Sequence, residues 1–140
     1  MLGEDALLNN LGFENTAIGF DALLGNINGD GNTAVGGYAL LNNTDGISNT
    51  AIGNAALANN TTGGYNVAIG GEALELNQTG IGNVAIGPMA ALGSTGSDNI
   101  AVDDKALANS DRGDENVAIG ESALSYCTGS NNVALGTVPE

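Results

Sequence analysis

Apolar and polar residues follow a short pattern that recurs along nearly the whole chain. An Asn is followed two residues later by Ala and three residues later by Ile, Val or Leu, and a Gly lies three residues before each Asn. Successive units are 17 residues apart, or 16 in two cases. The recurring Asn residues are Asn15, Asn32, Asn49, Asn66, Asn83, Asn99, Asn116 and Asn132. The Ala positions are Ala17, Ala34, Ala51, Ala68, Ala85, Ala101, Ala118 and Ala134, and the β-branched residues after them include Ile18, Ile52, Ile69, Ile86 and Ile119.

Each unit predicts two short extended segments. The stretch 66–70 has β-branched residues at alternate positions between a turn-forming Asn and Gly, which is typical of a strand. Seven residues after the Asn a second Ala follows, usually with Leu behind it, and this Ala-Leu segment predicts a second, weaker strand. Gly, Asn, Asp, Ser and Thr between the two favour chain reversal. A helix is disfavoured, because four to six residues between glycines are too few to nucleate one.

Such units predict an all-β solenoid, since a single flattened coil cannot bury a core alone. We expect about eight coils of 16–17 residues over residues 1–136, with parallel strands stacked in register. The two one-residue deletions fall in turns, where they leave the strand register intact. Residues 137–140 leave the pattern and are expected to begin a following element or to mark the end of the segment.

Alternation along each strand creates two apolar faces, one with the β-branched residues and one with Ala and Gly. One face can line the inside of the coil. The other would lie exposed as a continuous apolar stripe on a single chain, and such stripes usually mark an interface. The pattern therefore predicts self-association.

The repeated Asn-Thr-Ala-Ile-Gly (15–19, 49–53) and Asn-Val-Ala-Ile-Gly (66–70, 83–87), with Ala-Leu behind them and Gly before the next Asn, resemble YadA-like head repeats of trimeric autotransporter adhesins. They are also similar to repeats of phage-type trimeric tail fibres and related adhesive trimers. The resemblance implies a homotrimer of left-handed parallel β-rolls. The hand comes from the resemblance alone, because crossovers between parallel strands are generally right-handed.

The same resemblance implies a function and a location. The chain would be a structural or adhesive segment whose turns are presented to a glycan or an extracellular matrix protein. The alternative is a passive spacer in a fibre that carries a separate tip domain. Either role is extracellular, at a cell surface anchored through a region outside this segment, or in a virion fibre.

Charge narrows the range of partners. The chain has 16 acidic residues against Lys105 and Arg112, a net charge of -14. Phosphate backbones and anionic membrane surfaces would be repelled. No apolar run reaches the roughly 18 to 20 residues that span a bilayer. We therefore expect no nucleic-acid partner and no membrane insertion of this segment.

The residue types for catalysis are scarce. There is no His, and Cys127 is the single cysteine, so a nucleophile with a neutral-pH base cannot be assembled. We predict neither an enzyme nor a cofactor. Residues 26–31 imitate the opening of a calcium loop, but Gly37 stands where that loop requires Glu, so no metal site is predicted there. A cation at the acidic turn 111–115 stays open as an alternative.

Four further features bear on recognition. Arg112, Gly113 and Asp114 form the integrin-type tripeptide, although Gly113 is also the glycine that every unit carries. Collagen-binding segments of the YadA-like family have a Ser after the Asn, which the units here lack. Thr16, Thr33 and Thr50 begin a row of equivalent threonines of the kind that can order water in an ice-binding solenoid. Val67 takes the next equivalent position, so the row ends there. The five aromatic residues could stack on sugar rings or cap the core; they are Tyr38, Tyr65, Tyr126, Phe13 and Phe20.

Overall fold

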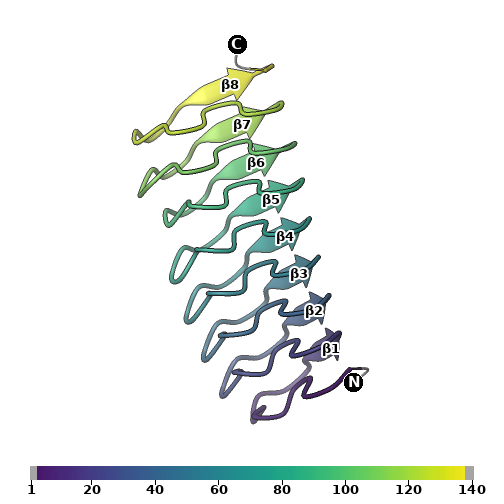
Figure 1. The fold of residues 1–140 in the computed structure, drawn as a ribbon. Coiled ribbons are helices and arrows are strands. Elements are labelled where there is room, and N and C mark those ends of the chain that lie inside the picture. The colour runs from purple at the N-terminus through teal and green to yellow at the C-terminus, as the bar shows by residue number, and fades with distance from the viewer. Residues whose placement is uncertain (1–2, 138–140) are drawn as a thin grey trace.

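The computed structural model describes residues 3–137 and shows one solenoid built on a single parallel sheet (Figure 1). Eight strands of three residues each are hydrogen-bonded in chain order, so seven complete turns separate the first from the last. No residue in this range is helical. The strands are β1 (Thr16–Ile18), β2 (Thr33–Val35), β3 (Thr50–Ile52), β4 (Val67–Ile69), β5 (Val84–Ile86), β6 (Ile100–Val102), β7 (Val117–Ile119) and β8 (Val133–Leu135).

Equivalent repeat positions pair across every strand boundary. Ala17 lies opposite Ala34, and the same register continues to Ala134 at β8. It survives the two shortened units, where Val84 pairs with Ile100 and Val117 with Val133. The predicted solenoid of parallel strands in register is therefore confirmed, and the deletions are absorbed in the turns. Residues 138–140, where a following element is expected to begin, lie outside the described range.

The core consists of stacked small side chains. The central Ala of each strand from β1 to β7 is fully buried, and Ala134 in β8 is half-buried. A second file of Ala and a file of Leu complete the interior; the fully buried leucines are Leu23, Leu40, Leu57, Leu74 and Leu107. All five aromatic residues within residues 3–137 are exposed. Alanine thus faces inward, and the β-branched residues on either side of it face outward.

The Ala-Leu segment is not a strand, so that prediction is wrong. Its residues form consecutive turns in which every second residue is left-handed, as with Glu72 (φ 60°) and Leu74 (φ 52°). The reason lies in burial. Ala73 and Leu74 are neighbours in sequence and both fully buried, whereas neighbours in a strand point to opposite faces. The turns still bond to adjacent coils, since Glu72 N donates to Asn54 O at 2.9 Å and Leu74 N to Ala90 O at 3.0 Å.

The recurring Asn residues, each directly before a strand, form a ladder along the solenoid. The six from Asn32 to Asn116 are buried, and Asn15 and Asn132 at the two ends are half-buried. Asn66 is fully buried, and its Nδ2 donates to Asn49 Oδ1 at 3.1 Å and to Gly80 O at 2.8 Å. Its own Oδ1 accepts from the backbone N and Nδ2 of Asn83 at 2.9 and 3.1 Å. The sequence predicts these residues only as turn formers. They also join successive coils, because each amide satisfies groups on the coils before and after it.

A second Asn ladder runs through the turns, at the position four residues after the second Ala of each unit. Asn43 Nδ2 donates to Asn26 Oδ1 at 2.6 Å, and Asn60 Nδ2 donates to Asn43 Oδ1 at 2.7 Å. Beyond Asn77 the equivalent positions are Ser94, Ser110 and Cys127. Ser94 Oγ is buried and has no hydrogen-bond partner, so the ladder is interrupted there. Cys127 therefore stands at a structural repeat position, where its Sγ accepts from Asn132 Nδ2 at 3.5 Å.

The residue after each strand adopts a backbone conformation that suits glycine. Gly70 has φ 135°, and a Cβ added there would collide with the carbonyl oxygen of Gly87 on the next coil. Asp103 is the one exception to glycine at this position in the repeats, and it is held at φ 103°. Backbone outliers of this kind cost on the order of 1 to 3 kcal/mol.

Replacing Asp103 by Gly is therefore expected to raise the free energy of unfolding by about 1 kcal/mol, because relief of strain exceeds the added entropy of the unfolded chain. Denaturant unfolding measures the change. Asp103→Ala is the control, since it removes the carboxylate and retains the Cβ, and it should bring no gain. An equal gain from both variants would assign the effect to charge and contradict the strain argument.

Candidate recognition surfaces

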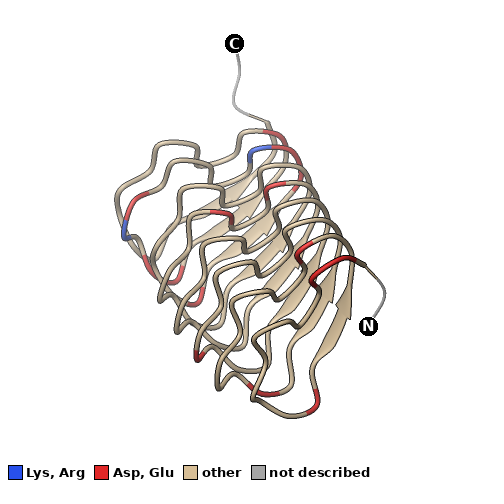
Figure 2. Cartoon of the chain, turned by 60° about the horizontal axis from the view of Figure 1, so that its bottom comes forward, with Lys and Arg blue, Asp and Glu red and all other residues tan. Residues whose placement is uncertain are grey.

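The outer face of the sheet is an uncharged and mostly apolar strip. Each strand turns its first and third side chains outward, and they are Thr, Val, Ile or Leu in all eight strands. The outward Ile residues expose substantial area, for example 39% at Ile52 and 42% at Ile119. No strand contains a charged residue, and Figure 2 shows the acidic residues on the turns. A long, uncharged apolar face of this kind is unusual for the surface of a single chain.

The threonines on this face are few. Thr16, Thr33 and Thr50 lie opposite one another in register, and Val67 takes the next place. A threonine file that orders water would therefore be only three rungs long. The remaining outward positions are aliphatic, so the strip as a whole is better suited to contact with another apolar surface.

The integrin-type tripeptide is built into a repeat turn. Arg112 is exposed and left-handed (φ 57°), whereas Gly113 is buried and its carbonyl accepts from Asn99 Nδ2 at 2.8 Å. Asp114 Oδ1 accepts from Ser97 N at 2.8 Å on the preceding coil. Asp30, at the equivalent position, makes the same bond to Phe13 N at 2.7 Å. One carboxylate oxygen of the tripeptide is thus used to hold neighbouring coils together, while the Arg112 side chain reaches solvent.

The tyrosines singled out from the sequence do not converge on one site. Tyr38 lies in the turn after β2, with its ring centroid 5.4 Å from that of Phe20 in an edge-to-face arrangement. Tyr65 is exposed in the turn before β4, at a different repeat position. The third tyrosine, Tyr126, lines a recess that the sequence does not single out.

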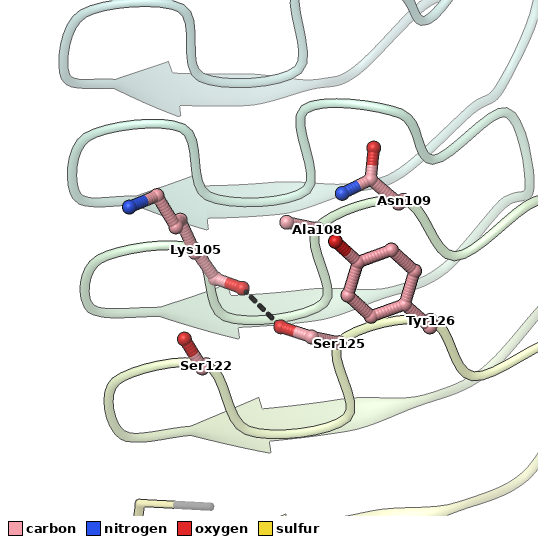
Figure 3. Close-up of a pocket in the computed structure, with 6 residues that line it drawn as sticks. All are labelled: Lys105, Ala108, Asn109, Ser122, Ser125 and Tyr126. Atoms are coloured by element: carbon pink, nitrogen blue, oxygen red, sulfur yellow. Dashed lines mark hydrogen bonds between the residues drawn. The ribbon is translucent and has the colours of Figure 1, made fainter. Parts of the chain in front are cut away.

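This recess lies between two consecutive coils on the turn side of the solenoid and has a volume of about 270 Å³. Figure 3 shows its side chains in front of the strands, with the Tyr126 ring on one side and Ser122 and the Lys105 stem on the other. Ser125 Oγ donates to Lys105 O at 3.0 Å across its floor. The full lining is Lys105, Ala108, Asn109, Ser122, Ser125 and Tyr126.

The calcium-loop imitation at 26–31 does not gather oxygen ligands. Asn26 Oδ1 points into the interior and accepts from Asn43 Nδ2 at 2.6 Å. Asp30 Oδ1 is bonded to Phe13 N. Within residues 3–137 no three His, Cys, Asp or Glu side chains are placed to hold one metal ion. The same stretch of chain contains no helix with the length and apolar character to cross a membrane.

One carboxyl on the turn side has a shifted pKa. Partial burial, with repulsion from Glu72 as a smaller cause, raises the pKa of Glu75 above its ordinary 4.5. Between the ordinary and the raised pKa the folded chain binds more protons than the unfolded chain. The free energy of unfolding must therefore fall as pH rises from the ordinary pKa to the raised pKa. Above the raised pKa this loss of stability is complete.

Glu75→Gln is accordingly expected to raise the thermal unfolding midpoint at pH 7 and to leave it unchanged below about pH 4. Melts of the variant and the parent chain at the two pH values check this. Glu14→Gln, which removes one charge from an exposed turn, is the comparison, and it should have a smaller effect at pH 7. The same gain at both pH values would refute the assigned cause.

Comparison of the chain with family models, with curated proteins and with solved structures gave no match.

Proposed function

We propose that this chain is a rod-like segment of a trimeric surface adhesin or fibre, in which three copies pack their sheets around a common axis. The observation that carries the proposal is the uncharged strip of outward β-branched side chains, which extends over all eight strands. The left-handed course of the coil and the number three come from the resemblance of the repeats to YadA-like heads and phage-type trimeric fibres.

The composition of the core supports association. The inward side chains of the strands are methyl groups, and each buried methylene contributes only about 0.8 kcal/mol against a backbone entropy of about 1 to 2 kcal/mol per residue. The outward Ile and Val residues are larger, yet they face solvent in the single chain. Burying them between copies would therefore add apolar area that the coil alone lacks.

The distribution of charge is compatible with this arrangement. The acidic side chains lie on the turns and not on the strip (Figure 2). Copies that meet through their sheets would keep the carboxylates in solvent at the periphery. The same charge, -14 per chain, disfavours nucleic acid and anionic membranes as partners.

We further propose that the turns of the assembled rod serve recognition of a glycan or a matrix protein. The turns vary in residue type from coil to coil, whereas the strands keep a central Ala between Thr, Val, Ile or Leu, which is the division expected where a rigid scaffold presents binding residues. Arg112, Asp114 and Tyr65 are exposed on such turns. A catalytic role is not proposed, because the chain has no His to serve as a neutral-pH base.

Binding assays on the assembled protein test the adhesive role. Glycan arrays and immobilised collagen, fibronectin and laminin would be probed with the full 140-residue chain. Saturable binding to one class supports adhesion. Absence of binding to both classes would contradict adhesion and favour the passive spacer, in which the rod only separates a tip domain from its anchor.

A further inference from the structure

We propose that the recess beside Tyr126 is a binding site for one neutral pyranose unit of a glycan. This proposal rests on the adhesive function above and assigns it a place and a ligand class. The site combines residues from the turns between β6 and β7 and between β7 and β8 (Figure 3).

The recess exists because two consecutive coils carry small residues at one outward position. The position two residues after the second Ala is filled by Leu8, Leu24, Leu41 and Leu92 in four of the other coils. In the remaining two it is filled by Ala58 and Glu75, so outside the recess small residues do not occur there in consecutive coils. In the two coils of the recess it is filled by Ala108 and Ser125. Without a leucine there, the space between the flanking side chains stays open, and Ala108, only 3% exposed, forms its floor.

Tyr126 provides an aromatic wall. Its side chain is 76% exposed, so the ring makes little contact with the chain's own core. Its backbone is fixed, because Tyr126 N donates to Ala108 O at 3.0 Å. An exposed Tyr on this hydrogen-bonded backbone offers an apolar face and a polar tip, which suits the C–H face and the hydroxyls of a sugar ring.

Two further side chains bring polar groups to the recess. Among the described residues, the Asn109 amide and the Ser122 hydroxyl have no hydrogen-bond partner, and both line the recess. Ser125 Oγ is already used, since it donates to Lys105 O. An apolar wall with a few unpaired donors and acceptors is the usual make-up of a small-molecule site.

Charge selects a neutral ligand over an anionic one. Lys105 Nζ lies 3.9 Å from Asp104 Oδ2, and Figure 3 shows the ammonium at the outer end of the stem, on the side away from the Tyr126 ring. Glu121 precedes Ser122 in the same turn, and the chain as a whole has a charge of -14. A sugar acid would therefore gain little from Lys105 and be repelled by the surroundings.

The volume of about 270 Å³ is just below the range of about 300 to 1,000 Å³ that is usual for drug-sized ligands, so the recess is sized for one sugar ring. A ligand of about a dozen heavy atoms in a shallow recess is expected to bind with a Kd of roughly 1 mM or weaker. Several copies in one assembly would strengthen binding to a multivalent glycan without any new contact.

Amide chemical shifts of the isotope-labelled 140-residue chain test the proposal. The probes are methyl α-glucoside, methyl α-galactoside and N-acetylglucosamine, with glucuronic acid as the anionic comparison. We expect at least one neutral sugar to shift the Asn109, Ser122 and Tyr126 amides, with glucuronic acid at least 5-fold weaker. Tyr126→Ala should weaken binding at least 10-fold. Leu11→Ala, which removes an exposed apolar side chain far from the recess, should leave it unchanged.

Ala108→Leu provides a second variant, because it places in the recess the side chain that other coils already carry. It should fold normally by far-UV circular dichroism and reduce binding at least 10-fold. Sugar shifts centred on another turn, or a preference for glucuronic acid, would overturn the assigned site or ligand class while leaving glycan recognition standing. Absence of shifts with every probe would overturn the site itself. The mass of the assembly is measured separately, so failure of the rod proposal would be recognised independently.

Discussion

Replacing Asn66 by Ala is expected to lower the free energy of unfolding by about 4 kcal/mol, one of the largest effects of any single substitution in the chain. The substitution removes both donors to Asn49 Oδ1 and Gly80 O and the acceptor used by Asn83. These groups lie in the interior, where each unsatisfied donor or acceptor costs about 1 to 3 kcal/mol. Denaturant unfolding followed by circular dichroism measures the loss.

Asn54→Ala is the matched control for the ladder. Asn54 is exposed, and its single side-chain hydrogen bond, to Gly37 O, is 3.3 Å long. Its loss should change the free energy of unfolding by no more than about 0.5 kcal/mol. If Asn66→Ala and Asn54→Ala had similar small effects, the buried ladder would not be what joins successive coils.

Placing aspartates on the sheet face is expected to prevent association without unfolding the coil. Ile52 and Ile69 are paired neighbours of β3 and β4 and point outward. In the double variant Ile52→Asp, Ile69→Asp, the charges would be buried between copies, and association should weaken at least about 100-fold. Sedimentation velocity over a range of concentrations measures the change, and an unchanged far-UV spectrum shows that the fold is retained.

A control with the same added charge separates the interface from general repulsion. Asn54→Asp with Gln78→Glu adds two carboxylates on exposed turns and none on the strip. This variant should assemble like the parent chain. If the sheet-face variant also assembled normally, the strip would not be the contact surface. If both variants dissociated equally, net charge would be the cause.

The strand stack is predictable from the sequence because its signals are local and repeated. The Asn-to-Ala spacing fixes the register, and alternation places Ala68 and Ile69 on opposite faces, as observed. Sequence alternation alone does not decide which face is inside. The structure places the methyl groups inside, where they form one core with the buried leucines of the turns.

Other features are hidden from sequence reasoning for physical reasons. Leu74 has a positive φ, a backbone conformation that leucine rarely adopts, so the sequence gives no sign of it. The segment turns because Ala73 and Leu74 are both buried, and this burial is seen only in the structure. The ladder from Asn26 to Asn77 uses the same residue type that marks exposed turns, so composition cannot separate the two. The recess at Tyr126 lies where two consecutive coils carry Ala108 and Ser125 at one repeat position; the sequence shows these residues, but only the structure shows the open space beside them. Among the candidate recognition residues, Tyr38 and Tyr65 are found on separate turns and form no common site.

The mass of the purified chain in solution is the most direct test of the rod proposal. Sedimentation equilibrium should give three times 13.8 kDa, about 41 kDa, at micromolar concentration. A single species of 13.8 kDa that persists into the millimolar range would contradict it, because the uncharged strip would then face water permanently.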